Sequence, residues 1–203
     1  MKALKFLFTA FVVLFLFLLG VWIFAPWQQA GLYVLDSVRL MCAKNGVFMT
    51  YSDFSHEGLL SPVFRMKSFD IESPVAKVVM SDVVVEILPI ASLISGGASC
   101  RVRFGGSEIV MIPNNRLSIT HGDVTLSANE SSISATGADI AGDLSVTGEA
   151  TYNRNDGTIP YSTLLLKVPD NLGALLSNPM LSRFIESAGQ GEWRIKQNAP
   201  PRS

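Results

Sequence analysis

The sequence predicts a mainly β protein, in which an N-terminal transmembrane helix is followed by a curved antiparallel β-sheet domain with short flanking helices. Three observations predict this class. Residues 6–25 are almost wholly apolar, and from Val47 onward apolar and polar residues alternate with a period of two. The chain also lacks strands that alternate with long helices, so a doubly wound nucleotide-binding fold is not expected.

Composition limits the class of protein further. The 203 residues leave room for one ordinary domain. Only 16% of them are charged and 48% are hydrophobic, which fits neither a disordered chain nor an average soluble one. The formal net charge is -1, with Lys and Arg scattered singly, so no basic field is available for a phosphate backbone. We therefore expect no nucleic-acid partner.

Residues 1–27 are predicted to be a transmembrane anchor with a short cytoplasmic N-terminus. No charge lies between Lys5 and Asp36, and a helix over residues 6–25 covers roughly 30 Å, the thickness of the hydrocarbon layer. Trp22 and Trp27 suit the far interface, and the lysines before the apolar run favour the cytoplasm. A cleaved signal peptide is the alternative, but this run is longer than usual and lacks a small-x-small site. We expect one pass through the cell inner membrane, with the C-terminal part in the periplasm.

The rest of the chain divides into three predicted parts. Residues 28–46 are expected to form a juxtamembrane helix, because apolar residues recur three or four apart and Asn45-Gly46 supplies a stop. Residues 47–196 are expected to form a periplasmic β-rich domain. Residues 197–203, which include Pro200-Pro201, are expected to be a flexible tail.

Strands are predicted where alternation is bounded by turn residues. The first are expected over residues 47–52, 64–73 and 76–88, and Pro89 to Ser95 is predicted to be a short helix stopped by Gly96-Gly97. A meander of narrow strands is expected over 127–152, and a further strand over 164–168. A helix is expected over 171–188, kinked at Pro179, before a last strand at 193–195.

Two glycine-containing pairs are predicted to be hairpin loops. With Gly105-Gly106 as a two-residue loop, Phe104 faces Ser107, Arg103 faces Glu108 and apolar residues share one face. His121-Gly122 is predicted to close a second hairpin over residues 117–126 in the same way.

One face of the predicted sheet is continuously apolar and is the candidate functional surface. The sequence leaves two interpretations open: a closed core, or a groove for lipid chains or a hydrophobic partner. The residues assigned to this face are Val83, Val85, Ile87, Val102, Phe104, Ile109 and Met111.

Cys42 and Cys100 fall on the oxidising side of the predicted membrane, where disulfides persist. A disulfide between them is left open, because bridging needs Cα atoms within about 7 Å and a free cysteine also behaves as a small buried hydrophobe. No C-x-x-C is present, so redox catalysis and zinc binding lack their usual spacing. We expect no metal and no cofactor.

No catalytic residues are predicted. His56 and His121 are the imidazoles of the chain, no Gly-x-Ser-x-Gly elbow is present, and Asp139 with Asp143 is expected to cap turns. A hydrolase would need a pocket that holds one of the histidines against Ser and Asp.

The layout of the chain resembles bacterial type II secretion system protein N and its AsmA-like relatives. The segments that carry the resemblance follow an N-terminal anchor and a short helix. They are Gly58-Leu59-Leu60-Ser61-Pro62, Phe69-Asp70-Ile71, Val83-Val84-Val85-Glu86-Ile87, Pro89 to Gly97, the meander Gly137 to Tyr152, and Gly191-Glu192-Trp193-Arg194-Ile195.

This resemblance implies a non-enzymatic accessory protein of the type II secretion system, tethered to the inner membrane. Its expected partners are the membrane and other secretion or envelope subunits, which it would bind through the apolar face or the edges of its sheet. The alternative is an AsmA-like lipid-binding or lipid-transfer protein of the envelope, with phospholipid as the partner of the same face.

Overall fold

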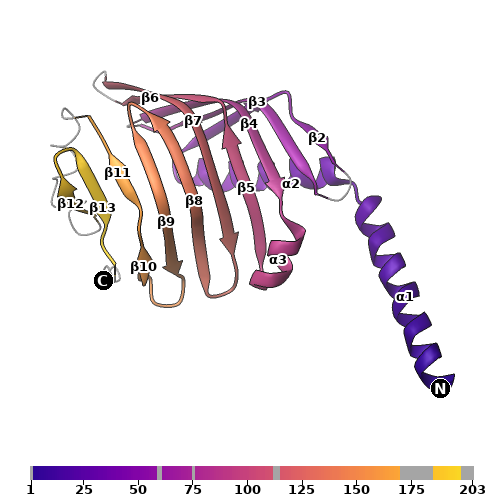
Figure 1. The fold of residues 1–203 in the computed structure, drawn as a ribbon. Helices are drawn as coiled ribbons and strands as arrows, with labels where there is room; N and C mark the ends of the chain where they lie inside the picture. Colours follow the sequence, from indigo (N-terminus) through magenta and orange to yellow (C-terminus); the bar gives the residue numbers. More distant parts are fainter. Residues whose placement is uncertain (1, 59–60, 75, 112–114, 170–184, 198–203) are drawn as a thin grey trace.

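A single curved antiparallel sheet dominates the computed structural model (Figure 1). The structure describes residues 2–58, 61–74, 76–111, 115–169 and 185–197. Within these ranges it contains thirteen strands and three helices. The predicted mainly β class with short flanking helices is therefore confirmed.

Two helices begin the chain and meet at a bend. The first, α1 (Lys2–Ile23), leads away from the sheet, and α2 (Trp27–Lys44) follows after Pro26 (Figure 1). The indole of Trp27 donates a hydrogen bond to Trp22 O (2.9 Å), and the two rings meet edge to face with centroids 4.5 Å apart. The predicted interfacial tryptophans thus stabilise the junction between the helices.

Within the part of the chain that the structure describes, no single helix is long and apolar enough to cross a membrane. By length and composition, residues Ala10–Ile23 and α2 are together a candidate for a broken span, with a bend of 63° between them. The predicted single span through the inner membrane accordingly stays a prediction.

The helix α2 packs on one face of the sheet at its β1 end. A Cβ at Gly31 would lie 2.7 Å from Phe54 Cζ and 2.8 Å from Phe64 Cε1, so the helix backbone rests directly on these two rings. The rings themselves stack with centroids 5.7 Å apart. Glycine at this position permits the close approach.

The strands follow one another mostly as antiparallel neighbours. Their bounds are β1 (Phe48–Ser52), β2 (Ser55–Glu57), β3 (Val63–Glu72), β4 (Ala76–Ile87), β5 (Ala98–Phe104), β6 (Gly106–Met111), β7 (Asn115–Ala128), β8 (Ser132–Gly142), β9 (Ser145–Asn153), β10 (Tyr161–Ser162), β11 (Leu165–Lys167), β12 (Ile185–Gly189) and β13 (Glu192–Ile195). The main order is β1-β3-β4-β5-β7-β8-β9-β11-β13-β12, with β6 between β4 and β7. The short helix α3 (Pro89–Ser95) connects β4 to β5, as predicted.

The helix predicted over residues 171–188 is wrong where it can be compared. Residues 171–184, with Pro179, lie outside the described residues, as does nearly all of the predicted tail, from residue 198 onward. Ile185 to Ser187 pair with β13 in strand β12, which then ends at Gly189. Backbone pairing with the final strand thus overrides the helix-forming sequence of this segment.

Both predicted hairpin loops are also wrong. Strands β5 and β6 lie end to end and pair in one common register with β4 on one side and with β7 on the other. Gly105 and Gly106 therefore lie within one long strand, and β7 continues unbroken through His121 and Gly122. The long neighbouring strands supply partners that a local hairpin cannot.

These glycines instead mark a bend that crosses the sheet. The pairing is interrupted at Lys67 in β3, Asp82 in β4, Gly105 between β5 and β6, and Thr120 in β7. Asp82 has a φ of 51°, which is rare outside glycine. Figure 1 shows the upper parts of the strands turning away from the lower parts. Bulges and glycine kinks are the usual devices that curve a sheet in this way.

The bend changes the phase of the alternation but keeps the apolar face continuous. Below it, one row of directly paired residues is Phe64, Val85, Val102 and Val124. Above it, the corresponding row is Ile71, Val78, Ile109 and Leu117. The apolar face therefore carries even-numbered residues of β5, such as Val102, and odd-numbered residues of β6, such as Ile109.

Several deeply buried apolar side chains lie on this face. They are Met49, Phe64, Met66, Val83, Leu117, Ile119, Ala138 and Val168. Above the bend, Leu117 and Val168 form a cluster with half-buried residues that include Ile109, Met111 and Trp193. Because Val168 and Trp193 come from the β11–β13 end of the sheet, the curvature brings this end onto the strands β6 and β7 at its middle.

Candidate functional site

The seven residues assigned to the apolar face fall into two groups. Val83, which is buried, lies beside Val85, Ile87, Val102 and Phe104 below the bend, and all four are half-buried. Val85 pairs directly with Val102, and Ile87 with Cys100. The other two residues, Ile109 and Met111, belong to the core cluster above the bend.

Below the bend the apolar face remains partly open to solvent. Leu126 is 37% exposed, Ile133 43% and Tyr152 42%. Ile133 and Tyr152 pair directly across β8 and β9, and Leu126 pairs with Cys100 on one side and Ala135 on the other. We call Leu126, Ile133 and Tyr152 the open apolar patch. Its occupation by a partner or by lipid stays a prediction.

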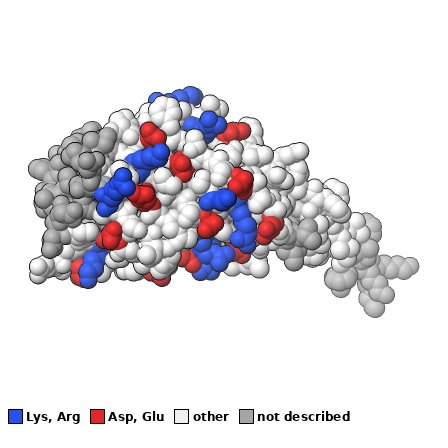
Figure 2. Space-filling view, turned by 90° about the horizontal axis from the view of Figure 1, so that it is seen from above, with Lys and Arg blue, Asp and Glu red and all other residues white. Residues whose placement is uncertain are grey.

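The opposite face of the sheet is polar and carries ion pairs. Arg101 donates two hydrogen bonds from Nε to the Asp123 carboxylate (2.8 and 3.1 Å). Arg103 Nη2 lies 3.6 Å from Glu86 Oε2. The hydrogen bond from Arg101 lowers the pKa of Asp123, and the pKa of Arg101 rises in return. Figure 2 shows Lys and Arg interspersed with Asp and Glu on the visible face, with no field of one sign.

The two cysteines are free thiols in the structure, Cys42 on α2 and Cys100 on β5. Both side chains are half-buried, and burial raises the pKa of the Cys100 thiol. A raised pKa leaves less of the reactive thiolate at neutral pH. The disulfide that the sequence left open stays open.

Among the described residues, neither histidine lies within hydrogen-bonding distance of both a nucleophile and a carboxylate. His121 Nε2 lies 3.8 Å from Asp139 Oδ2, and Thr120 Oγ1 lies 3.4 Å from His121 Nδ1. Both separations exceed the roughly 2.6–3.2 Å of an assembled nucleophile, base and carboxylate. These side chains stand exposed on the polar face, and His56 packs instead against Phe64 with ring centroids 5.5 Å apart.

Asp143, the other carboxylate of the predicted pair, has a structural role. Its Oδ2 accepts a hydrogen bond from Ser118 N (2.8 Å), which ties the turn between β8 and β9 to β7. The prediction that both carboxylates cap turns thus agrees with the structure for Asp143 and is wrong for Asp139, which lies within β8.

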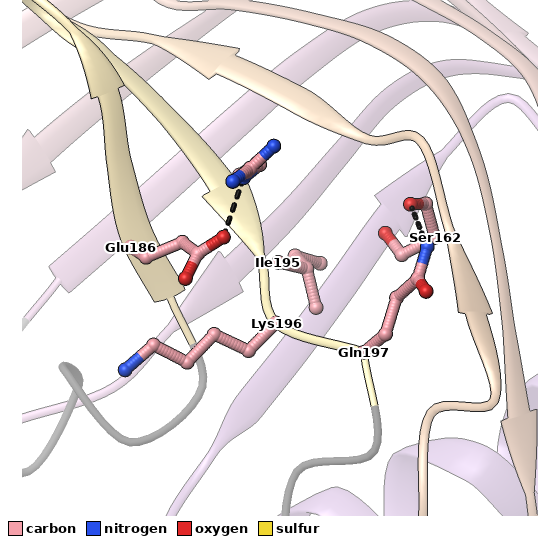
Figure 3. A pocket seen from close by; sticks show the side chains of 6 residues that line it. Ser162, Glu186, Ile195, Lys196 and Gln197 are labelled. Atoms are coloured by element: carbon pink, nitrogen blue, oxygen red, sulfur yellow. Dashed lines mark hydrogen bonds and ion pairs between the residues drawn. The ribbon is translucent and has the colours of Figure 1, made fainter.

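A polar pocket of about 430 Å³ lies between β10 and the β12–β13 pair (Figure 3). Glu186 and Arg194 form an ion pair on one side, and Gln197 Nε2 donates a hydrogen bond to Ser162 O (3.1 Å) on the other. Ile195 and Lys196 complete the lining. The described lining residues hold no histidine or cysteine, so they offer polar contacts and no nucleophile paired with a base.

Sequence reasoning missed one exposed apolar element, the outer side of α3. Ile90, Leu93 and Ile94 are 74%, 84% and 83% exposed. A signal was present, because no charged residue occurs between Glu86 and Arg101. The serines spaced three apart at positions 92 and 95 also marked the side of the helix that faces the protein.

The fold and surfaces define a class of protein: one curved antiparallel sheet with an apolar and a polar face, preceded by a long apolar helix. A family model matches residues 4–197, and its description is "Type II secretion system protein GspN-like, Synergistales". The chain belongs to this GspN-like family. No curated protein and no solved structure matches it. The match supports the resemblance to protein N of the type II secretion system, whereas the AsmA-like resemblance stays a prediction.

Proposed function

We propose that this protein is a non-enzymatic accessory subunit of the type II secretion system, held in the inner membrane by α1 with its sheet in the periplasm. The family match over residues 4–197 is the observation that carries the secretion role. The apolar character of α1 supports the anchor, since described side chains such as Phe11, Leu14 and Phe17 are more than half exposed. Such a helix is favourable in lipid and unfavourable in water.

The open apolar patch is the surface we assign to a partner subunit. Leu126, Ile133 and Tyr152 lie on neighbouring strands with their side chains partly in water, whereas Val83 on the same face is buried. An apolar segment of another secretion subunit would bury this patch and gain the associated hydrophobic free energy. The polar face carries paired charges and is better suited to solvent.

The partner can be identified by site-specific photo-crosslinking in cells that produce the secretion system. A photoreactive residue at Ile133 tests the patch. The same residue at Asp139 is the matched control, because Asp139 lies on the same strand, is exposed, and approaches His121 on the polar face.

We expect an adduct at position 133, identified by mass spectrometry as an inner-membrane secretion subunit, and little or none at position 139. An adduct with phospholipid alone would contradict the proposal and favour the lipid-binding alternative. Equal labelling at both positions, or no adduct at 133, would also contradict it.

A further inference from the structure

The helix α3 has its polar side toward the protein and its apolar side toward solvent. Ser92 Oγ donates a hydrogen bond to Leu88 O (2.8 Å) and accepts one from Ser99 N (2.9 Å). Ser95 Oγ lies 3.3 Å from Ser99 Oγ. Ile90, Leu93 and Ile94 point away from these contacts and are at least 74% exposed. A surface helix of a globular protein normally has the reverse arrangement.

The structure also holds α3 firmly in place. Gly96 ends the helix in the left-handed conformation with a φ of 64°, and Gly97 N donates to Ser92 O (3.1 Å). Gly97 lies against the neighbouring strand so closely that a Cβ would come 2.1 Å from Ala128 O. The exposed apolar side chains therefore belong to a fixed projection, since both ends of the helix are tied to the sheet.

The position of α3 points to one occupant. In Figure 1, α3 projects from the lower end of the sheet, and α1 descends toward the same end. If α1 crosses the bilayer, the membrane surface lies at this end. The segment from Ile87 to Cys100 is uncharged, whereas the neighbouring turns over residues 129–131 and 153–158 are polar. Apolar side chains flanked by polar turns are typical of an element that enters the headgroup and acyl boundary.

We infer that α3 is a second membrane contact, which inserts Ile90, Leu93 and Ile94 into the outer surface of the same bilayer that α1 crosses. This inference rests on the proposed anchoring by α1. It adds that the sheet stands at the lipid surface in a fixed orientation, held at two points. A single helical tether leaves rotation of the domain free, and a second contact removes that freedom.

The test uses a polarity-sensitive fluorophore on single cysteines in the full chain, reconstituted into phospholipid vesicles. Cys42→Ala and Cys100→Ala remove the native thiols. The probe is placed at Leu93→Cys on α3, at Phe11→Cys on α1, and at Glu72→Cys as the matched exposed control at the other end of the sheet. Nitroxide lipids with shallow or deep labels then report the depth of each probe.

We expect blue-shifted emission at position 93 and strongest loss of its emission with the shallow nitroxide, because interfacial elements enter about 5–10 Å. Position 11 should be quenched most by the deep label, and position 72 by neither. Quenching at 11 with none at 93 would overturn the inference and leave the anchor in place. No quenching at position 11 or at position 93 would overturn the anchor as well. Equal quenching at positions 93 and 72 would overturn the fixed orientation.

A second measurement keeps the native cysteines, in case their removal impairs folding. A photoreactive residue at Leu93 in the otherwise unchanged chain should form phospholipid adducts in the same vesicles, and one at Glu72 should not. Absence of lipid adducts at position 93 would overturn the inference.

Discussion

The ring of Phe104 lies directly over Gly122 of the neighbouring strand. The two residues pair across β5 and β7, and a Cβ at Gly122 would come 2.1 Å from Phe104 Cζ. An aromatic side chain that covers a cross-strand glycine is a known way to stabilise a kinked sheet. The pair lies next to the bend, where the strands change the phase of their alternation.

Gly122→Ala should destabilise the protein, because the new methyl group would overlap the ring. Overpacking of this kind costs about 1–3 kcal/mol of unfolding free energy. The measurement is urea unfolding of the full chain in detergent, followed by tryptophan fluorescence. Measured in a Phe104→Leu background, the same substitution should cost less. An unchanged unfolding midpoint for Gly122→Ala alone would show that the ring does not occupy this space.

Asp82→Gly should stabilise the protein, because Asp82 adopts a φ of 51° at the bend. The left-handed conformation costs a non-glycine residue roughly 1–2 kcal/mol, and the larger unfolded-state entropy of glycine offsets about half of the gain. Lys67→Gly is the matched control, since Lys67 lies at the same break in the pairing but is not among the residues with positive φ. The control should lose stability, and a loss in both variants would contradict the strained bend.

Ser99→Ala should weaken the attachment of α3. Ser99 is 2% exposed, and its hydroxyl lies 2.9 Å from Ser127 Oγ and 3.3 Å from Ser95 Oγ. Loss of a buried hydrogen bond costs about 1 kcal/mol. Hydrogen exchange measured by mass spectrometry should become faster in residues 89–97 and remain unchanged in β8. Ser187→Ala, an exposed serine on β12, serves as the control.

The pair of Arg101 and Asp123 predicts a pH dependence of stability. The hydrogen bond from Arg101 lowers the pKa of Asp123 below its value in the unfolded chain. The contribution is therefore fully present above the unfolded-state pKa of about 3.9 and is lost as the pH falls through the lowered folded-state pKa. Asp123→Asn should be less stable than the parent at pH 7, and the difference should close in acid. Arg101→Gln should show the same pattern, and a difference that persists at low pH would contradict the assignment.

The sequence predicted the class of the fold but not the path of the strands at the bend. The change from Val102 and Phe104 to Ile109 and Met111 on one face fits a two-residue hairpin and a kinked continuous strand equally well. The choice depends on the long partners β4 and β7, which pair with both β5 and β6. Local sequence does not contain this long-range pairing. The same holds for Ile185 to Ser187, which pair with β13 rather than extend a helix.

The sequence indicated which residues share the apolar face but not how much of that face is covered in the fold. The seven apolar residues assigned to β4, β5 and β6 are buried or half-buried, and their role as a groove stays a prediction. Alternation alone does not say which part of such a face is covered. Gly31 of α2 and the curvature that brings Trp193 toward Leu117 decide this, and both are tertiary effects. The uncharged segment and the spaced serines were a signal for the inverted polarity of α3, and the hydrogen bonds of Ser92 and Ser95 show which side of the helix faces the protein.

We propose that the sheet stands outside the cytoplasm, on the far side of the bilayer that α1 enters. The most direct measurement is a C-terminal fusion to alkaline phosphatase, which needs the oxidising periplasm to form its disulfides. A matched fusion to green fluorescent protein reports a cytoplasmic C-terminus. We expect an active phosphatase and a dark fluorescent fusion. An inactive phosphatase with a bright fluorescent fusion would contradict this proposal.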